Sequence, residues 1–219
     1  MTQIEPGAHD LLLAGASGLV GREVVRQWTG PATLHLLVRR PMLAPPHGVV
    51  QMVDFTALPA LPRAGAALCA LGTTIAVAGS QAAFRAVDFD AVLAFARAAR
   101  AAGVARFAVV SALGADARSS NFYSRVKGEM EAALGELGFA SLVIARPSLL
   151  AGDREATGQP ARRGERIALA LTRPLAPLIP RAFRPVAAAD VARAMLRALA
   201  APAGGARVLS SAEMQPPGR

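Results

Sequence analysis

The sequence predicts an α/β protein with a single doubly wound parallel sheet. Short runs of consecutive apolar residues alternate with longer stretches in which apolar residues recur every three or four positions. The short runs are typical of strands buried on both faces, and the longer stretches are typical of amphipathic helices. Strands that alternate with helices favour βαβ units, in which helices cover both faces of a parallel sheet. A glycine-rich turn also joins the first strand to the first helix.

The order of the elements follows from these patterns. Gly103 and Gly138 follow two of the predicted helices, where glycine commonly ends a helix. The predicted strands cover residues 10–14, 33–38, 49–53, 66–71, 106–111 and 141–145, with 207–210 as a final candidate. The predicted helices cover residues 19–28, 81–102, 122–137, 163–171 and 188–200.

The C-terminal part of the chain contains the least regular segment. Residues 174–185 include four prolines and are predicted to be irregular. We interpret residues 152–185 as a small lid or substrate region within one domain that spans residues 1–219. The last six residues, beginning with Met214, are predicted to be frayed.

The composition narrows the class of protein. The chain has 219 residues, of which 53% are hydrophobic, which suits one globular domain. Its one cysteine, Cys69, excludes an intrachain disulfide, and its three histidines are scattered, so we predict no metal site. No apolar run reaches the roughly 18 residues of a membrane span, and the first ten residues lack the basic start of a secretory signal. We therefore expect a cytoplasmic protein.

The formal net charge is +9, and 23 of the 24 basic residues are arginine. A surface for nucleic acid is one interpretation of this charge. The arginines are dispersed, however, and aromatic residues do not interleave with them, so binding of nucleic acid is not favoured. The charge fits an anionic small molecule, such as a phosphate-bearing cofactor, equally well.

The turn after the first strand has a glycine at every third position and leads into a helix. This spacing is the dinucleotide-binding fingerprint, in which glycines permit a tight turn, a close approach to the pyrophosphate and close helix packing. The helix N-terminus then favours the anion. The predicted cofactor-binding segment consists of Gly15, Ala16, Ser17, Gly18, Leu19, Val20 and Gly21.

The end of the second strand bears on which dinucleotide is bound. Arg39 and Arg40 stand there in place of the acid that would bind the 2′-hydroxyl of NAD. Guanidinium groups suit a 2′-phosphate, so we prefer NADP(H), with NAD(H) as the alternative. Two solvated arginines are the other interpretation. Further cofactor contacts are predicted at the carboxyl ends of the third and fourth strands, at Asp54, Phe55, Leu71, Gly72, Thr73 and Thr74.

The single tyrosine and the single lysine of the chain, Tyr123 and Lys127, lie four positions apart on one predicted helix. Residues at this spacing share a helix face, and a nearby ammonium ion favours the phenolate form of tyrosine. Such a tyrosine can exchange a proton with a carbonyl or an alcohol near neutral pH. Ser111 ends the fifth strand, twelve residues before Tyr123. Its hydroxyl can form a hydrogen bond with a substrate oxygen, or it can simply stabilise the turn that follows the strand.

These motifs resemble the short-chain dehydrogenase/reductase superfamily in order and spacing, from the glycine turn through Ser111 to Tyr123 and Lys127. The chain is most similar to the Tat-interacting-protein-like group of atypical NAD(P)-binding proteins. The segments that carry the finer resemblance are 69–74, 87–90, 111–116, 126–129 and the pair Arg146 and Pro147.

The resemblance implies a Rossmann fold, an NADP(H) cofactor and three catalytic residues. Tyr123 is then the proton donor or acceptor, Lys127 holds the nicotinamide ribose, and Ser111 orients the carbonyl. Arg146 and Pro147 match the family motif after the sixth strand, beside the cofactor. Many members place an asparagine of a proton relay where this chain has Asp88, and extended members carry a larger C-terminal substrate domain.

The leading functional expectation is an NADP(H)-dependent oxidoreductase acting on a small carbonyl or alcohol. The alternative is a regulatory or assembly protein that senses NADP(H) with little turnover and binds a protein partner. A nucleotide-sugar epimerase or dehydratase is a weaker alternative, because it needs a larger substrate domain. The protein is expected to be a monomer or a homodimer.

Overall fold

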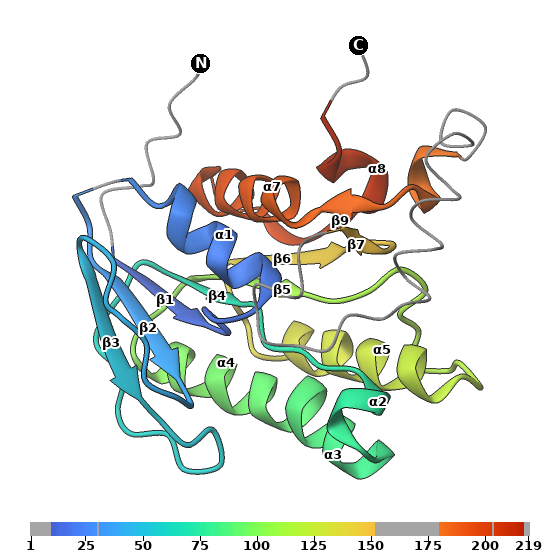
Figure 1. The fold of residues 1–219 in the computed structure, drawn as a ribbon, viewed down its shortest axis with the longest axis horizontal. Helices are drawn as coiled ribbons and strands as arrows, with labels where there is room; N and C mark the ends of the chain where they lie inside the picture. The colour runs from blue at the N-terminus through green and yellow to red at the C-terminus, as the bar shows by residue number, and fades with distance from the viewer. Residues whose placement is uncertain (1–9, 30, 152–179, 203, 217–219) are drawn as a thin grey trace.

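The computed structural model describes residues 10–29, 31–151, 180–202 and 204–216. At its centre lies a parallel sheet of seven strands in the order β3-β2-β1-β4-β5-β6-β9 (Figure 1). Its strands are β1 (Leu11–Ala14), β2 (Leu34–Val38), β3 (Gly48–Met52), β4 (Ala66–Cys69), β5 (Arg106–Val110), β6 (Ser141–Arg146) and β9 (Gly205–Ser210). The separate strands β7 (Leu150–Ala151) and β8 (Val186–Ala187) form a short parallel pair.

Helices cover both faces of the sheet. Helices α1 and α7 lie on one face, and α4 and α5 lie on the other (Figure 1). The helices are α1 (Leu19–Gln27), α2 (Ile75–Ala78), α3 (Gln81–Arg85), α4 (Ala91–Ala101), α5 (Phe122–Gly135), α7 (Ala188–Ala200) and α8 (Ser211–Met214), with a π-helical turn η1 (Ala86–Asp90) and a 3-10 turn η4 (Arg181–Phe183). The predicted α/β fold with one doubly wound parallel sheet is confirmed.

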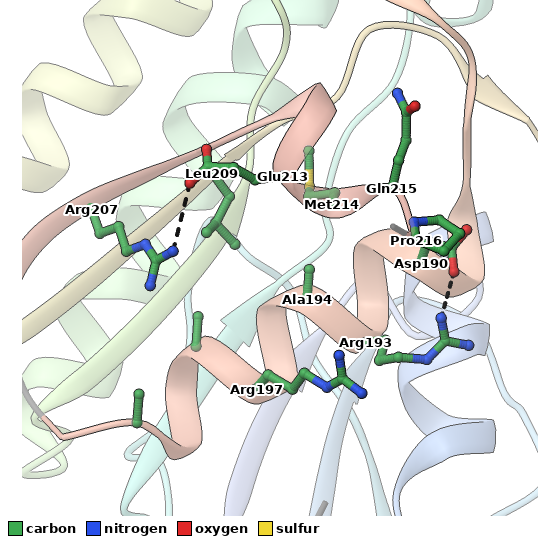
Figure 2. Close-up of a pocket in the computed structure, with 12 residues that line it drawn as sticks. Asp190, Arg193, Ala194, Arg197, Arg207, Leu209, Glu213, Met214, Gln215 and Pro216 are labelled. Atoms are coloured by element: carbon green, nitrogen blue, oxygen red, sulfur yellow. Dashed lines mark hydrogen bonds and ion pairs between the residues drawn. The ribbon is translucent and has the colours of Figure 1, made fainter. Parts of the chain in front are cut away.

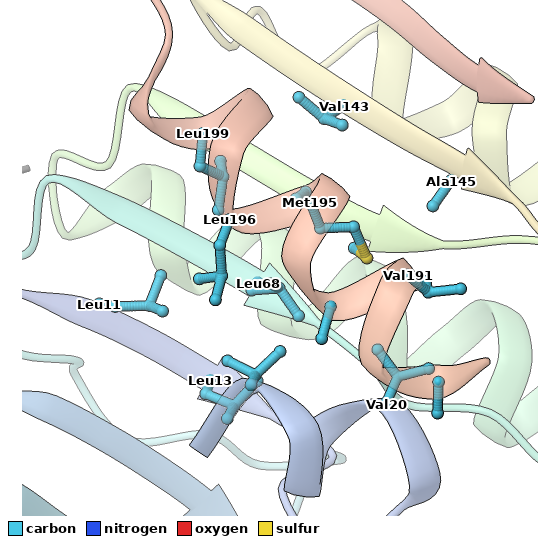
Figure 3. Close-up of a cluster of buried hydrophobic side chains, with 14 of the residues drawn as sticks. Leu11, Leu13, Val20, Leu68, Val143, Ala145, Val191, Met195, Leu196 and Leu199 are labelled. Carbon is cyan, nitrogen blue, oxygen red and sulfur yellow. The ribbon is translucent and has the colours of Figure 1, made fainter. Parts of the chain in front are cut away.

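The continuous apolar strands are explained by burial on two sides. In β1, Leu11 and Leu13 pack under α1 and α7, in the cluster that Figure 3 shows. Leu12 and Ala14 point the other way, into the cluster under α4 and α5. All four are at most 1% exposed. Alternate side chains of a strand point to opposite faces, so a strand covered on both faces is apolar throughout.

The sheet reverses its strand order beside β1, which pairs with β2 on one side and with β4 on the other. Ligands of doubly wound sheets bind outside the carboxyl ends of the strands at such a switch point. The ends of the central strands are level, because Ala14 pairs with Cys69, Cys69 with Val109, and Val109 with Ile144. The segments that follow β1, β4, β5 and β6 therefore meet at one edge.

Two predicted elements need correction. The helix predicted over residues 81–102 is divided by the π-turn η1, whose residue Asp88 is 1% exposed. Met214 is not frayed: it ends α8 and is 4% exposed in the core beside α7. The helix predicted over residues 163–171 and most of the proline-rich segment lie outside the described residues.

Candidate functional site

The glycine turn after β1 is packed too closely for side chains. Gly15 has a φ of +88°, and a Cβ atom there would lie 2.5 Å from the carbonyl carbon of Ala70. A Cβ atom on Gly21 would lie 2.1 Å from the carbonyl oxygen of Gly15. Glycine is therefore required at both positions. The close packing lets α1 start next to the carboxyl end of β1.

The N-terminus of α1 is suited to a phosphate. Gly18 is the N-cap residue and provides no capping side chain, and the first turn of the helix contains no acidic residue. The partial positive charge and the backbone N–H groups of a helix N-terminus attract anions. Arg22 Nε donates a hydrogen bond of 3.1 Å to the carbonyl oxygen of Ser17, which holds the outer part of the turn. The residues present thus fit a dinucleotide pyrophosphate.

The predicted contacts after β2 and β3 have different surroundings. Arg39 and Arg40 are both exposed at the carboxyl end of β2. Asp54 is exposed after β3, and the backbone N–H of Thr56 donates to its Oδ1 at 2.9 Å. This hydrogen bond holds the pKa of the Asp54 carboxyl below its ordinary value. Phe55 is 5% exposed and packs in the cluster under α4, so its side chain belongs to the core.

The segment after β4 runs past the buried carboxylate of Asp88. Leu71 is buried, whereas Gly72 is exposed. The backbone N–H of Thr73 donates to Asp88 Oδ2 at 2.8 Å, and Thr74 caps α2 with its side chain. The Asp88 carboxylate on η1 therefore holds this predicted cofactor segment in place through the backbone of Thr73.

Lys127 is buried at the same place. Its Nζ lies 2.8 Å from Asp88 Oδ1 and donates to the carbonyl oxygen of Val110 at 3.4 Å, and the residue is 3% exposed. Burial alone would lower the pKa of the Lys127 ammonium. The Asp88 carboxylate, the Tyr123 phenol and the Cys69 thiol together outweigh burial, so the pKa of Lys127 is raised above its ordinary value. Lys127 is therefore an ammonium ion throughout the physiological range.

Tyr123 lies one helical turn before Lys127 on α5, as predicted. Its ring packs against the fully buried ring of Phe84 on α3, with 5.3 Å between the ring centroids. The start of the helix is fixed by Asn121, whose side chain accepts a hydrogen bond from the backbone N–H of Ser124. Tyr123 is only partly buried, so its side chain remains in reach of solvent.

Ser111 is held by a partner that the sequence argument missed. Its Oγ donates a hydrogen bond to Glu131 Oε1, and Arg146 Nε donates to both oxygens of Glu131 at 3.1 and 3.2 Å. Pro147, which follows Arg146 in the chain, is buried. Because the proton of Ser111 is directed at Glu131, its oxygen is left to accept a hydrogen bond in this arrangement. Donation to a carbonyl requires the hydroxyl to rotate.

Glu131 could have been found from spacing. It lies four residues after Lys127, as Lys127 lies four residues after Tyr123, so all three share one face of α5. The contact of Asp88 with Lys127 could not have been found in this way, because the two residues lie on separate elements, η1 and α5. The structure thus brings together Ser111, Tyr123, Lys127 and Arg146 with two further acids.

A cavity of about 480 Å³ lies elsewhere, between α7, β9 and α8 (Figure 2). Arg193 pairs with Asp190 at 2.5 Å, and Arg207 pairs with Glu213 at 3.6 Å. Neighbouring carboxylates therefore neutralise two of its three arginines, and it lacks a concentrated positive charge. None of the predicted site residues lines this cavity. Its lining residues are Asp190, Arg193, Ala194, Arg197, Ala198, Ala201, Arg207, Leu209, Glu213, Met214, Gln215 and Pro216.

The switch point and the glycine turn define a dinucleotide-binding protein of the Rossmann class. Comparison with known proteins agrees with this class. The chain belongs to the NAD(P)H-binding family, whose sequence pattern matches residues 15–202.

Two kinds of relative show how far the similarity extends. The chain is 34% identical to protein HTATIP2 of Rattus norvegicus over 206 residues, which cover 89% of this chain and 83% of that protein. It is 47% identical to the mitochondrial protein fmp52 of Emericella nidulans over 88 residues. That alignment covers 40% of this chain and 38% of the relative, so the match with the fungal protein is partial.

Solved structures share the fold at low sequence identity. MoeE5 in complex with UDP-glucuronic acid and NAD superposes with a TM-score of 0.69 at 19% identity, covering 91% of this chain and 75% of that one. The ADP-L-glycero-D-manno-heptose-6-epimerase of Helicobacter pylori gives 0.68 at 18% identity, covering 96% and 79%. At these identities the likeness concerns the fold alone.

The described residues contain neither a membrane-spanning helix nor a cluster of metal ligands. Within residues 10–29, 31–151, 180–202 and 204–216, no helix combines the length and apolar character needed to cross a membrane. The same part of the chain contains no group of three histidine, cysteine, aspartate or glutamate residues arranged to hold a metal ion. Since the fungal relatives are named mitochondrial, the cytoplasmic location expected from the sequence stays a prediction.

Proposed function

We propose that the protein is an NADP(H)-dependent oxidoreductase that moves a hydride to or from a small carbonyl or alcohol. The observation that carries the proposal is the buried Lys127 ammonium, one helical turn from the partly buried Tyr123, at the carboxyl edge of the sheet. A bound nicotinamide dinucleotide would supply the hydride chemistry. This chain supplies the binding site, the orientation and the proton.

Tyr123 is the proposed proton donor or acceptor. In the reducing direction, its hydroxyl gives a proton to the substrate oxygen while that carbonyl carbon receives the hydride. In the oxidising direction, it takes the proton from the alcohol. The Lys127 ammonium favours the phenolate that remains after Tyr123 donates its proton. The free-energy difference between the protonated and deprotonated tyrosine is therefore smaller near neutral pH, which permits proton transfer in either direction.

Lys127 and Ser111 are the proposed positioning groups for the reaction. Lys127 Nζ forms an ion pair with the Asp88 carboxylate and donates a hydrogen bond to the carbonyl oxygen of Val110. An ammonium ion has three N–H donors, and we assign one of them to the ribose hydroxyls beside the nicotinamide. Ser111 bonds the substrate oxygen, accepting from an alcohol directly or donating to a carbonyl after its hydroxyl rotates from Glu131.

Residues 15–21, together with Arg39 and Arg40, are the proposed binding groups for NADP(H). The N-terminus of α1 holds the pyrophosphate, and the two exposed guanidinium groups hold the 2′-phosphate. Residues 71–74 and Asp54 line the remaining length of the cofactor. NAD(H) remains the alternative cofactor, and the Arg39 and Arg40 variant decides between them.

Removing both arginines, in an R39A–R40A variant, should weaken NADPH binding about tenfold or more and leave NADH binding nearly unchanged. Each charge-assisted hydrogen bond contributes roughly 1.5–3 kcal/mol, and only NADPH carries the 2′-phosphate. Titration of nicotinamide fluorescence measures both dissociation constants. The matched control is R63A, because Arg63 is exposed but precedes β4, at the opposite edge of the sheet. An equal loss for both cofactors would contradict the 2′-phosphate assignment.

The experiment that tests the function is direct measurement of hydride transfer. NADPH oxidation is followed against aldehydes, ketones and quinones, and NADP⁺ reduction against the corresponding alcohols, with binding of each dinucleotide measured in parallel. We expect binding and turnover of at least one small carbonyl. If the protein binds neither dinucleotide, the proposal fails at its first step.

A second function is favoured by one observation, the hydrogen bond of Ser111 to Glu131. A serine whose proton is engaged within the protein suits a site that binds NADP(H) without turning a substrate over. Such a protein would sense the cofactor and change its affinity for a protein partner. Tight NADPH binding without turnover of any substrate in the panel would favour this function, and capture of partners with and without NADPH would follow.

A further inference from the structure

We propose that Asp88 is a positioning residue that keeps Lys127 charged and ties it to the cofactor-binding segment after β4. This inference rests on the proposed function for its catalytic meaning, but the contact itself is a property of the protein without cofactor. Asp88 is 1% exposed, and both of its oxygens are directed at groups of the site. Oδ2 accepts from the backbone N–H of Thr73, and Oδ1 faces Lys127 Nζ, each at 2.8 Å.

The π-turn η1 carries Asp88. It widens one turn of an otherwise continuous helix and places an acidic side chain among buried groups, and π-turns of this kind are frequent at functional sites. The contact with Lys127 is an ion pair, because Oδ1 lies 2.8 Å from the ammonium and has no hydrogen-bond partner within the described residues. A neutral side chain would remove the charge from this pair.

The surroundings of Lys127 show why it needs this partner. The groups that face its ammonium are Asp88 from η1, Tyr123 from its own helix, Cys69 from β4 and the carbonyl oxygen of Val110 from β5. Of these four groups, Asp88 is the one that provides a carboxylate. A buried lysine without an opposite charge tends to lose its proton. Without Asp88, Lys127 would therefore release its proton at a lower pH, and Tyr123 would lose its cation from that pH upward.

Many similar enzymes have a neutral asparagine at the position where this chain has the carboxylate of Asp88. An asparagine presents one oxygen and one NH₂ group. At position 88, its oxygen could accept from Thr73 or from Lys127, and its NH₂ group would then face the other donor. A carboxylate presents an oxygen to both groups at once, so Asp88 pairs with the lysine and accepts from the backbone of Thr73.

The unique lysine allows a direct test. In the full chain labelled with ¹³Cε-lysine, a single Cε–Hε resonance reports the titration of Lys127. We expect the wild-type midpoint to lie above the value of about 10.4 for an exposed lysine. In D88N the midpoint should fall below that value by at least about one pH unit. D90N is the matched control, because Asp90 ends the same π-turn, is exposed and carries the same charge; its midpoint should equal that of the wild type.

Each outcome bears on the proposal. An unchanged midpoint in folded D88N, or a wild-type midpoint at or below 10.4, overturns it. If D88N fails to fold, the wild-type titration still decides, and a D88N–K127M variant should restore folding because no unpaired buried charge remains. Failure of that rescue contradicts the charge pairing. The titration needs no cofactor, so absence of turnover would defeat the proposed function and leave this result intact.

Discussion

Replacing Tyr123 with phenylalanine should lower turnover about 10²- to 10⁴-fold, the usual contribution of a positioned acid or base. NADPH binding should change little, because the ring that packs against Phe84 is kept and only the hydroxyl is removed. The step that becomes slower is proton transfer to or from the substrate oxygen. Steady-state rates with NADPH, alongside a binding titration, measure the two effects separately.

Ser124 provides the matched control for this substitution. It follows Tyr123 on α5 and is not fully buried, so S124A also removes one hydroxyl from the first turn of the helix. The S124A variant should keep wild-type turnover and binding. Equal rates in Y123F and wild type would exclude Tyr123 from the chemistry, whatever the fate of the cofactor site.

Replacing Gly128 with alanine should destabilise the protein by about 2 kcal/mol or more. A Cβ atom there would lie 2.1 Å from the backbone nitrogen of Ala117 and 2.2 Å from the carbonyl carbon of Asp116. Backbone atoms cannot move aside as a side-chain end can. The affected loop connects Ser111 to Tyr123 and is tied to α5 by the backbone N–H of Asp116, which donates to the carbonyl oxygen of Ser124 at 3.1 Å. Turnover should therefore fall with stability.

The same helix supplies the comparison for Gly128. Gly135 ends α5, and a Cβ atom there would meet no atom of the described residues within 4 Å. G135A should be neutral or stabilise the protein by up to about 1 kcal/mol, because alanine favours a helix more than glycine does. Urea denaturation of both variants isolates the close contact from helix propensity. Equal stabilities for G128A and G135A would show that the loop can move away.

Much of the fold could be predicted because each strand carries its own signal. Continuous burial makes β1, β2 and β6 apolar throughout, and the helices between them show a different period. The boundaries of α7 at residues 188–200 were predicted as observed. The short helices α2 and α8 were missed, because four residues are too few for a periodic pattern.

Some features of the site could also be predicted from local sequence, whereas others depend on tertiary packing. The glycine turn and the Tyr123–Lys127 spacing are local, so the sequence alone determined that the chain has a dinucleotide turn and a tyrosine and lysine on one helix face. Which groups face Lys127 and Ser111 was decided only by tertiary structure. Asp88 reaches Lys127 across 39 positions because η1 packs against α5, and Glu131 meets Ser111 because α5 packs beside the end of β5. Such contacts depend on how separate elements pack, and no local pattern of residues encodes that arrangement.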